Sequence, residues 1–363
     1  MIWLAYIVFG FTAIQLLVAL VNLFTETHLP YTGKRPGMRV SVLIPARNEE
    51  KNIGNILGDL KKQPFMNIEV IVFNDQSEDR TERVVQEFTR PDPRFRLINS
   101  DRLPEGWLGK NYACHRLASE AAGDYLLFLD ADVRISGNLI GDAISYADRT
   151  RSDLVSIFPM QRIITTGEWT TVPNMNYILV TLLPLILVRK TNFTSLAAAN
   201  GQFMLFSKDA YSHLLPHEKM KLSKVEDILI ARYFKETGKR VSCLLGDKRI
   251  SCRMYSGFSG AVNGFSKNVA EFFGDSHILA SVFWLITTFG FIAVLLCLPF
   301  TCFLDYLLMY LSTRVAVSLS ARQNILKNML FILPLQFSMG LFIVKSMANK
   351  FFKKYSWKGR EIS

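Results

Sequence analysis

Two acidic residues separated by one small residue, Asp130 and Asp132, directly follow the apolar run Tyr125–Leu129. Because side chains alternate along a strand, residues two apart share a face, and two carboxylates held there repel each other. A hard divalent cation such as Mg²⁺ or Mn²⁺ relieves this repulsion and can also bridge the phosphates of a bound diphosphate. Exposed turn acids are the alternative, but the position at the end of an apolar strand favours a metal site.

A second set of polar residues follows two further apolar runs, Val40–Ile44 and Glu69–Phe73. Proline has no N–H to donate, so Pro45 is expected to end the first of these strands. Asn48 or Glu49 then has the side chain needed to cap the helix that follows. Such strand-to-helix loops are common, so the pattern alone is a weak sign of a binding site.

Arg47 and Asp75 are the residues of these two loops that suit a ligand best. A cation beside a helix N-terminus suits a nucleotide or a phosphate group. Asp75 stands at the tip of the second strand, where a base or a ribose can be held. The acids and hydroxyls after it are explained as turn and capping residues. For Asp75 itself, the turn and the ligand interpretations are equally supported.

Glu226 and Asp227 stand at the beginning of the helix-like stretch Ile228–Thr237. Acids in the first turn of a helix interact favourably with its dipole. A general base that takes a proton from an acceptor hydroxyl is the functional alternative. The pattern of residues alone leaves both interpretations open.

Strand-like and helix-like segments alternate along residues 33–275. This order predicts an α/β fold with a mostly parallel sheet and helices on both faces. Ligands of such sheets bind at the carboxyl ends of the strands, where the residues above stand. The expected strands are Val40–Ile44, Glu69–Phe73, Arg96–Ile98 and Tyr125–Leu129, and the expected helices include Glu49–Leu60, Thr81–Phe88 and Tyr112–Ala121.

Residues 2–24 form an apolar run without a charge. About 20 apolar residues cross the ~30 Å of bilayer hydrocarbon, so this run predicts a transmembrane anchor. A signal peptide is less well supported, because the run lacks a basic segment before it and a small-x-small cleavage site. The first cationic residues after it are Lys34, Arg35 and Arg39, which predicts that residues 33–275 face the cytosol.

The C-terminal third carries three apolar runs, residues 278–300, 302–319 and 329–344. The middle run includes Asp305 and Arg314, each of which is costly at the centre of a bilayer. We expect this run to lie in the interface or to re-enter, so that the other two span. A third span is the alternative, because the sequence does not decide the count.

Residues 278–347 are thus expected to form a membrane region of two to three helices, followed by a basic tail at 348–363. This distribution predicts a plasma-membrane protein that crosses the bilayer several times. A further apolar run, Tyr177–Val188, is short for a span and contains Pro184. A buried helix or strand and a membrane-surface segment are equally supported for it.

Half of the 363 residues are hydrophobic, and the net charge is +11. Much of the positive excess lies beside apolar segments, which favours anionic lipid headgroups as its partner. We expect no nucleic-acid partner, because the sequence has no basic stripe interleaved with aromatic residues and no zinc-finger or helix-turn-helix spacing. The five cysteines show no paired CxxC spacing, which indicates reduced thiols rather than disulfides or a zinc site.

Taken in order, these segments resemble the family 2 glycosyltransferases, whose catalytic domain has the GT-A fold, a Rossmann-like α/β sheet. The resemblance covers residues 38–270. The matching segments are VSVLIPARNEEKNI at 40–53, VIVFNDQSEDRT at 70–81, LFLDADV at 127–133 and VEDILIARYFKETG at 225–238.

The resemblance implies a role for each matching residue. Asp132 corresponds to the ligand of a divalent metal, and Asp227, with Glu226 before it, to the catalytic base. Members of this kind invert the configuration in a single displacement, and the metal stabilises the departing nucleoside diphosphate. The residues that correspond to donor-binding positions are Pro45, Arg47, Glu49, Asp75 at the uracil end, and Asp130 at the diphosphate.

A narrower resemblance lies in LPEGWLGKN at 103–111, together with RMY at 253–255 and GFSKN at 264–268. These motifs are similar to those of membrane glycosyltransferases with hydrophobic acceptors, among them carotenoid-acid enzymes of the staphyloxanthin pathway and hopanoid-associated enzymes. By this resemblance Lys110 lies near the donor phosphates. The candidate acceptor or clamp residues are Trp107, Gly201, Gln202 and Lys267, the last standing where processive members carry the arginine of a QxxRW motif.

The leading interpretation is the non-processive transfer of one sugar, from a nucleotide sugar such as a UDP-hexose, to a lipid-like acceptor in the membrane. Transfer to polyprenyl phosphate or to a polysaccharide is the enzymatic alternative. A membrane scaffold that has kept a nucleotide-sugar fold is the non-catalytic alternative. It leaves unexplained why donor, metal and base motifs occur together.

Overall fold

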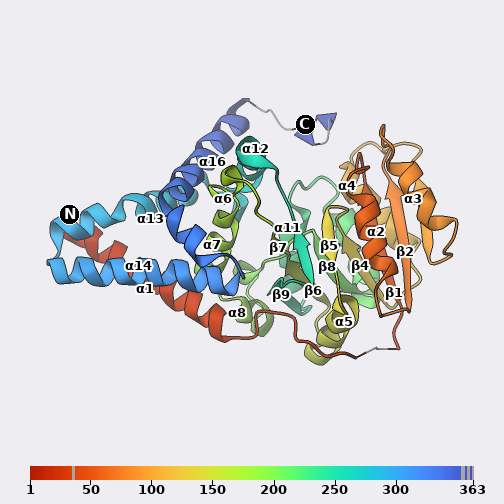
Figure 1. Ribbon diagram of the computed structural model, residues 1–363, viewed down its shortest axis with the longest axis horizontal. Coiled ribbons are helices and arrows are strands. Elements are labelled where there is room, and N and C mark those ends of the chain that lie inside the picture. Colours follow the sequence, from red (N-terminus) through yellow and green to blue (C-terminus); the bar gives the residue numbers. More distant parts are fainter. Residues whose placement is uncertain (35–36, 353–355, 358–359, 362–363) are drawn as a thin grey trace. The chain divides into compact units, whose positions relative to one another are not determined.

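The computed structural model describes residues 1–34, 37–352, 356–357 and 360–361 (Figure 1). Arg35 and the lysines at 353, 354 and 358 of the expected basic tail lie outside these residues. The chain divides into two compact units. The sheet unit comprises Thr27–Met160 and Leu185–Cys252, and the helical unit comprises Met1–Glu26, Gln161–Pro184 and Arg253–Ser363.

The strands that build the sheet unit begin and end as follows. They are β1 (Val40–Ala46), β2 (Ile68–Asn74), β3 (Phe95–Asn99), β4 (Tyr125–Leu129), β5 (Val133–Ile135), β6 (Leu154–Phe158), β7 (Met160–Gln161), β8 (Phe203–Ser207), β9 (Val241–Leu245) and β10 (Ile250–Cys252). The helices between them are α2 (Ile53–Lys61), α3 (Thr81–Thr89), α4 (Gly109–Ser119), α5 (Leu139–Thr150), α8 (Leu185–Lys190), the short η1 (Thr194–Leu196), α9 (Lys208–Leu214), α10 (Pro216–Lys219) and α11 (Glu226–Glu236).

The main sheet has seven strands in the order β3-β2-β1-β4-β8-β6-β9 (Figure 1). β1 pairs in parallel with β2 and β4, β2 with β3, and β6 with β9. β8 is antiparallel to both of its neighbours, β4 and β6. The expected mostly parallel sheet is therefore confirmed, with one reversed strand. A smaller sheet has the order β5-β10-β7.

The central strands are apolar because both of their faces are covered. Every residue of β2 is buried, and so is every residue of β1 except Pro45, as expected for parallel strands between two layers. The four expected strands are confirmed as β1 to β4. The expectation that Pro45 ends the first strand is wrong, because β1 continues to Ala46. Its pairing with β4 stops at Leu43, and the strand continues only along β2.

The helical unit contains the terminal parts of the chain and two internal segments. Its elements are α1 (Ile2–Phe24), α6 (Thr166–Trp169), α7 (Pro173–Leu182), α12 (Gly257–Asn268), the short η2 (Glu271–Phe273), α13 (His277–Cys297), α14 (Phe300–Ser320), α15 (Ile325–Leu330), α16 (Ile332–Phe352) and the paired β11 (Ser356–Trp357) and β12 (Arg360–Glu361).

Among the described residues, three helices are long and apolar enough to cross a membrane: α1, α13 and α14. α14 includes the run 302–319, which we expected to lie in the interface or to re-enter. It forms one continuous helix, and its length and composition allow a span. The run 329–344 lies in α15 and α16, and α16 is not among these three candidates. The number of spans and their orientation stay predictions.

The expected domain 33–275 is divided between the two units, because residues 161–184 and 253–275 group with the terminal helices. Within the helical unit, α7 packs against α1 and α14, and α12 packs against α16. Residues Tyr177–Val188, expected as a buried or a membrane-surface segment, form the end of α7 and most of α8. The chain breaks between these helices at Leu183 and Pro184, since proline has no N–H for a continuing helix.

Buried amides connect the helices of the helical unit. The Asn22 side chain of α1 donates to the backbone oxygens of Val180 and Leu183 at 2.9 and 2.8 Å. Gln336 of α16 accepts from the Thr288 hydroxyl of α13 at 3.0 Å and donates to the Tyr310 hydroxyl of α14 at 3.1 Å. Apolar helix surfaces are much alike, so burial alone does not select one packing arrangement over another. Hydrogen bonds between side chains on neighbouring helices make that selection.

Candidate active site

Lys110 lies between acids from two other parts of the sheet unit. Its Nζ is 3.1 Å from Asp130 Oδ1 and 3.2 Å from Glu226 Oε1. Lys110 comes from the first turn of α4, Asp130 follows β4, and Glu226 begins α11. Burial disfavours the charged amine, but the carboxylates of Asp130 and Glu226 outweigh it and raise the pKa of Lys110 well above its usual value. The amine therefore stays charged and joins Asp130, expected at the diphosphate, to Glu226 of the expected base pair.

Asp227 is held by backbone N–H groups on both of its oxygens. Gly201 N donates to Oδ2 and Ile228 N donates to Oδ1, each at 2.9 Å. Burial and the neighbouring Glu226 raise the pKa of Asp227 to about 6, against the opposing effect of Lys110 and of these N–H groups. A carboxylate with a pKa near 6 is ionised at neutral pH and is still basic enough to accept a proton.

Gly201 lies where the chain passes closest to these charges. A Cβ atom on Gly201 would lie 3.0 Å from Lys110 Nζ and 3.7 Å from Asp227 Oδ2. A contact of 3.0 Å is tight, and the Lys110 amine would have to move by a few tenths of an ångström to make room for a larger residue. Gly201, expected as an acceptor or clamp residue, thus contributes a backbone donor to Asp227, the expected base.

Asp130 and Asp132 lie on the turn that follows β4, where the charge of Asp130 acts on Asp132. Burial, then Asp130, then Glu49 raise the pKa of Asp132 to about 6. Asp132 Oδ1 is buried and has no hydrogen-bond partner among the described residues. Gln202, directly before β8, holds this turn in place, because its backbone oxygen accepts a hydrogen bond from Asp130 N at 3.3 Å. Its side chain is buried and donates to Cys252 Sγ at 2.8 Å, which is a structural contact.

A divalent metal fits the two carboxylates of this turn. Two close acids, one with an orphaned buried oxygen, leave hard oxygen donors for a cation that the protein alone does not satisfy. No group of three or more His, Cys, Asp or Glu side chains in the described part of the chain is arranged to hold a metal. The remaining ligands would have to come from the donor's phosphates and from water, as is usual for Mg²⁺.

Arg47 braces the two loops that were expected to bind the donor. Its guanidinium is buried, and its Nη1 donates to the backbone oxygens of Asp75 and Gln76 at 2.7 and 3.1 Å. Asp75 is also buried, and its N–H donates to Ala46 O at 2.8 Å. Arg47 thereby fixes the position of Asp75 at the carboxyl end of β2. Direct contact of Arg47, Pro45 or Asp75 with a donor stays a prediction.

The expected helix cap by Asn48 or Glu49 is wrong. α2 begins at Ile53, with Asn52 at the N-cap position. Asn48 has a left-handed backbone, and its side-chain oxygen accepts from Glu78 N at 2.9 Å across the neighbouring loop. Glu49 accepts from the Asn52 side chain at 2.8 Å, so both residues stabilise the loop before the helix.

Asn111 is a residue of this site that the sequence motifs contained but to which we assigned no role. Its side chain is buried, and Nδ2 donates to the backbone oxygens of Met220, Lys221 and Ser223 at 2.8, 3.3 and 2.9 Å. This segment leads directly into Glu226 at the start of α11. The available signal was a polar residue on the face of α4 that also buries Cys114.

Trp107 packs beside the same helix, with its ring 5.7 Å from Tyr112 and 5.1 Å from His115 between centroids. Lys267 is exposed on α12 of the helical unit. Acceptor or clamp roles for both residues stay predictions. Arg253 of the RMY segment donates to Glu168 Oε1 at 2.7 Å. This bond and backbone N–H groups outweigh burial and lower the pKa of Glu168 to about 2, so Arg253 has a structural role.

The described cysteines form no disulfide, since all five, at 114, 243, 252, 297 and 302, have free thiols. The redox state of these thiols stays a prediction.

A mostly parallel sheet with acids after β2 and β4 and an acid pair at the start of α11 is the arrangement of the GT-A fold. Residues 41–215 match the family model of glycosyl transferase family 2. Residues 41–215 thus form a glycosyltransferase domain similar to those of family 2.

Two curated relatives bear the same name, 4,4'-diaponeurosporenoate glycosyltransferase. The one from Staphylococcus haemolyticus (strain JCSC1435) is 30% identical over 255 residues, which cover 67% of this chain and 64% of the relative. The one from Staphylococcus aureus (strain USA300) is 27% identical over 348 residues, which cover 89% of this chain and 88% of the relative. The chain thus spans less than two thirds of the first relative's length and most of the second.

A solved structure shares the fold over the whole chain. It is the mannosyltransferase PcManGT from Pyrobaculum calidifontis in complex with GDP-Man and Mn²⁺, with 15% identity, a TM-score of 0.60 and coverage of 98% of both chains. At this identity the likeness shows the fold alone.

Proposed function

We propose that this protein transfers a single sugar from a nucleoside-diphosphate sugar, such as a UDP-hexose, to a hydrophobic acceptor in the membrane, with inversion at the anomeric carbon. The observation that carries the proposal is the acid cluster around Lys110, which joins Asp130 after β4 to Glu226 and Asp227 at the start of α11. Donor-binding and proton-accepting groups are thereby held together in one unit.

The donor would lie at the carboxyl ends of β1, β2 and β4, where ligands of parallel sheets bind. Asp75 would hold the uracil end, and Lys110 would contact the diphosphate. Bound phosphates would compete with Asp130 and Glu226 for the amine, because all three are anionic acceptors.

The chemical step is a single displacement. Asp227 accepts the proton of the acceptor's hydroxyl group, or of a carboxyl group that its apolar surroundings keep protonated, and the acceptor oxygen forms a bond to the anomeric carbon. The bond between that carbon and the diphosphate oxygen breaks, and the nucleoside diphosphate leaves with the electron pair. The two N–H donors on Asp227 hold its carboxylate in one orientation, which favours a defined direction for the proton transfer.

Asp130 and Asp132 are the residues that would hold a divalent cation, Mg²⁺ or Mn²⁺. When bound, such a cation supplies a Lewis acid that neutralises charge on the leaving diphosphate. The orphaned Oδ1 of Asp132 supports this assignment, because a buried carboxylate oxygen without a partner is otherwise costly.

A lipid-like acceptor is supported by the three helices that can cross a membrane and by the names of the two relatives, which act on 4,4'-diaponeurosporenoate. We further propose a multi-pass protein of the plasma membrane with the sheet unit in the cytosol. The cations at Lys34 and Arg39, after α1, support this orientation.

The test uses the full chain in lipid nanodiscs with UDP-glucose, 4,4'-diaponeurosporenoate and Mg²⁺ or Mn²⁺. We expect one sugar per acceptor by mass spectrometry. Loss of a general base costs about 10²–10⁴-fold in rate, so Asp227→Asn should lose transfer to that extent, and Asp132→Ala should lose it together with the response to metal. Full transfer by both variants would contradict the mechanism, and a phosphate-linked sugar or a polymer would contradict the proposed product.

A further inference from the structure

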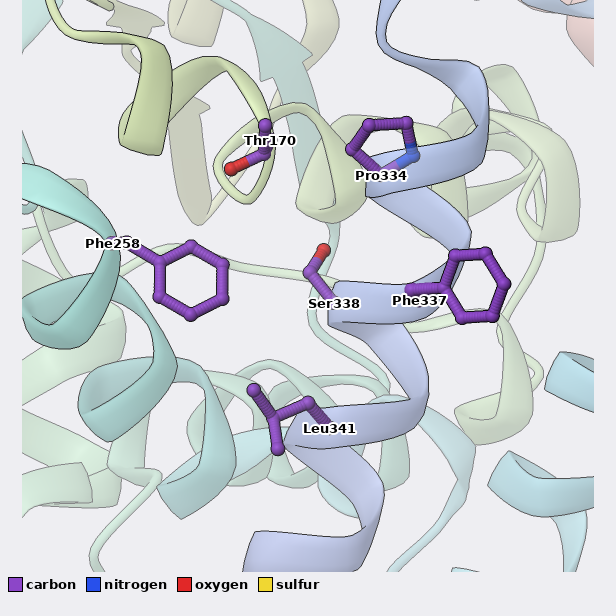
Figure 2. A pocket seen from close by; sticks show the side chains of 6 residues that line it. All are labelled: Thr170, Phe258, Pro334, Phe337, Ser338 and Leu341. Carbon is purple, nitrogen blue, oxygen red and sulfur yellow. The ribbon is translucent and has the colours of Figure 1, made fainter.

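The helical unit contains a pocket of about 290 Å³ between α12, α16 and the end of α6. Figure 2 shows Phe258 of α12 on one side of the open space and Pro334, Ser338 and Leu341 of α16 on the other, with Thr170 at one end. Phe337 completes the lining. The pocket carries no charged side chain, so it suits an uncharged, apolar ligand.

Gly167 lets the wall formed by α12 approach α6. A Cβ atom at this position would lie 2.7 Å from Phe258 N and 3.0 Å from Phe258 Cβ. Real side chains do not come this close to a backbone nitrogen. The position of Phe258 beside the pocket therefore depends on glycine at 167.

The wall formed by α16 continues into an exposed apolar stripe. One face of this helix is buried, with Leu335, Met339 and Phe342 almost inaccessible to solvent. On the opposite face, exposed apolar residues recur every three or four positions, which is the period of an α-helix. The exposed apolar residues of this stripe are Leu333, Phe337, Leu341, Val344, Met347 and Phe351.

A stripe of five turns exposes more contiguous apolar surface than soluble monomers usually leave in water. In a unit with three candidate spans, membrane hydrocarbon is the medium that covers such a surface. The pocket shares Phe337 and Leu341 with the stripe, so a hydrocarbon chain can pass from the membrane into the pocket without crossing water.

We infer that this pocket binds a hydrocarbon segment of the lipid acceptor, an inference that rests on the function proposed above. The volume of about 290 Å³ lies just below the roughly 300–1,000 Å³ typical of small-molecule sites. It therefore holds part of a long chain and leaves the rest in the membrane. The pocket selects acceptors by the thickness and length of their apolar part and makes no contribution to donor binding.

Photolabelling tests the site without requiring transfer. The full chain in phosphatidylcholine–phosphatidylglycerol nanodiscs is irradiated with a long-chain fatty acid that carries a diazirine near its methyl end, and the labelled peptides are mapped. We expect label on α12 and α16 around Phe258 and Leu341, and displacement by excess 4,4'-diaponeurosporenoate. Leu341→Trp should fill the pocket and reduce the label at least five-fold, whereas Leu333→Trp, on the stripe outside the pocket, should not.

Kinetics supply the second arm. In Leu341→Trp the KM for the acceptor should rise at least five-fold, with the KM for UDP-glucose unchanged, and Phe258→Ala should widen the pocket and admit bulkier acceptors. Equal labelling of Leu341→Trp and wild type, or displacement by added phospholipid but not by the acceptor, overturns the inference. Label in the pocket, displaced by the acceptor but without sugar transfer by the wild type, leaves the inference standing and refutes the proposed function.

Discussion

Replacing Lys110 by methionine should raise the pH at which the enzyme loses activity on the acid side. Asp227 must be ionised to accept a proton, and its pKa is about 6, so wild-type activity should fall below pH 6. The Lys110 cation lowers the pKa of Asp227. Without it the carboxylate should take up a proton at a higher pH, and the acid side of the profile should move upward.

The size of this shift follows from the distance between the two charges. A single point at the Cβ position of Gly201 lies 3.0 Å from Lys110 Nζ and 3.7 Å from Asp227 Oδ2, so these atoms are at most about 7 Å apart. At an effective dielectric constant of ~20, that separation corresponds to about 2.4 kcal/mol, or somewhat under two pKa units at about 1.4 kcal/mol each. Because Lys110 is 26% exposed, solvent reduces this, and we expect about one unit.

The assay is kcat/KM for UDP-glucose between pH 5 and 9, with saturating acceptor and a fixed metal concentration. The midpoint of the acid side should lie near 6 in the wild type and near 7 in Lys110→Met. Lys110→Arg keeps the charge and should keep the midpoint. An unchanged midpoint in Lys110→Met, with the same drop in donor affinity in both variants, would refute a role of Lys110 in the ionisation of Asp227.

Three further changes test the positioning of the site and the packing of the helices. Asn111→Leu leaves buried carbonyl oxygens without a hydrogen-bond donor, at a cost of about 1–3 kcal/mol each. We expect kcat to fall about tenfold or more, with little change in the KM for the donor. A melting curve of the same variant separates a local effect on the site from global unfolding. Gly201→Ala should displace the ammonium group at the centre of the site and lower kcat/KM about tenfold with an unchanged melting temperature; wild-type kinetics would contradict the close approach. Gly264→Ala places a Cβ atom 2.1 Å from the Tyr255 ring and should lower the melting temperature, whereas Gly260→Ala, with nothing within 4 Å, should not.

Local sequence patterns predicted the sheet because they report directly on burial. The strands β1 to β4 are short apolar runs, and the turn residues after them stand where the alternation of strands and helices predicts. The acids Asp75 and Asp130 therefore fall at carboxyl ends of parallel strands, as expected. The reversed β8 was not predicted, since an apolar run of five residues carries no information about strand direction.

The partners of the site residues could not be predicted, because they depend on contacts between distant parts of the chain. Lys110 contacts Asp130 and Glu226, which lie far from it in the sequence. The pattern around Arg47 was that of a phosphate-binding loop, yet its guanidinium is used by backbone oxygens of the next loop. A motif gives the type of a side chain, and only the fold decides which of its possible partners lies within reach.

The bonds of Gln336 have a consequence for how α16 can move. On the side of α13, the Trp284 indole donates to Gln336 O at 2.8 Å, and Gly340 leaves room for the same ring, since a Cβ atom there would lie 2.4 Å from it. The side-chain amide of Gln336 is also bonded to the Tyr310 and Thr288 hydroxyls. These bonds fix the rotation of α16 about its own axis relative to α13 and α14. Rolling the helix about its axis would break these bonds, which lie buried away from water. The orientation of the face that carries Leu341 is thereby fixed, so the lipid acceptor proposed above would meet the same surface at every encounter.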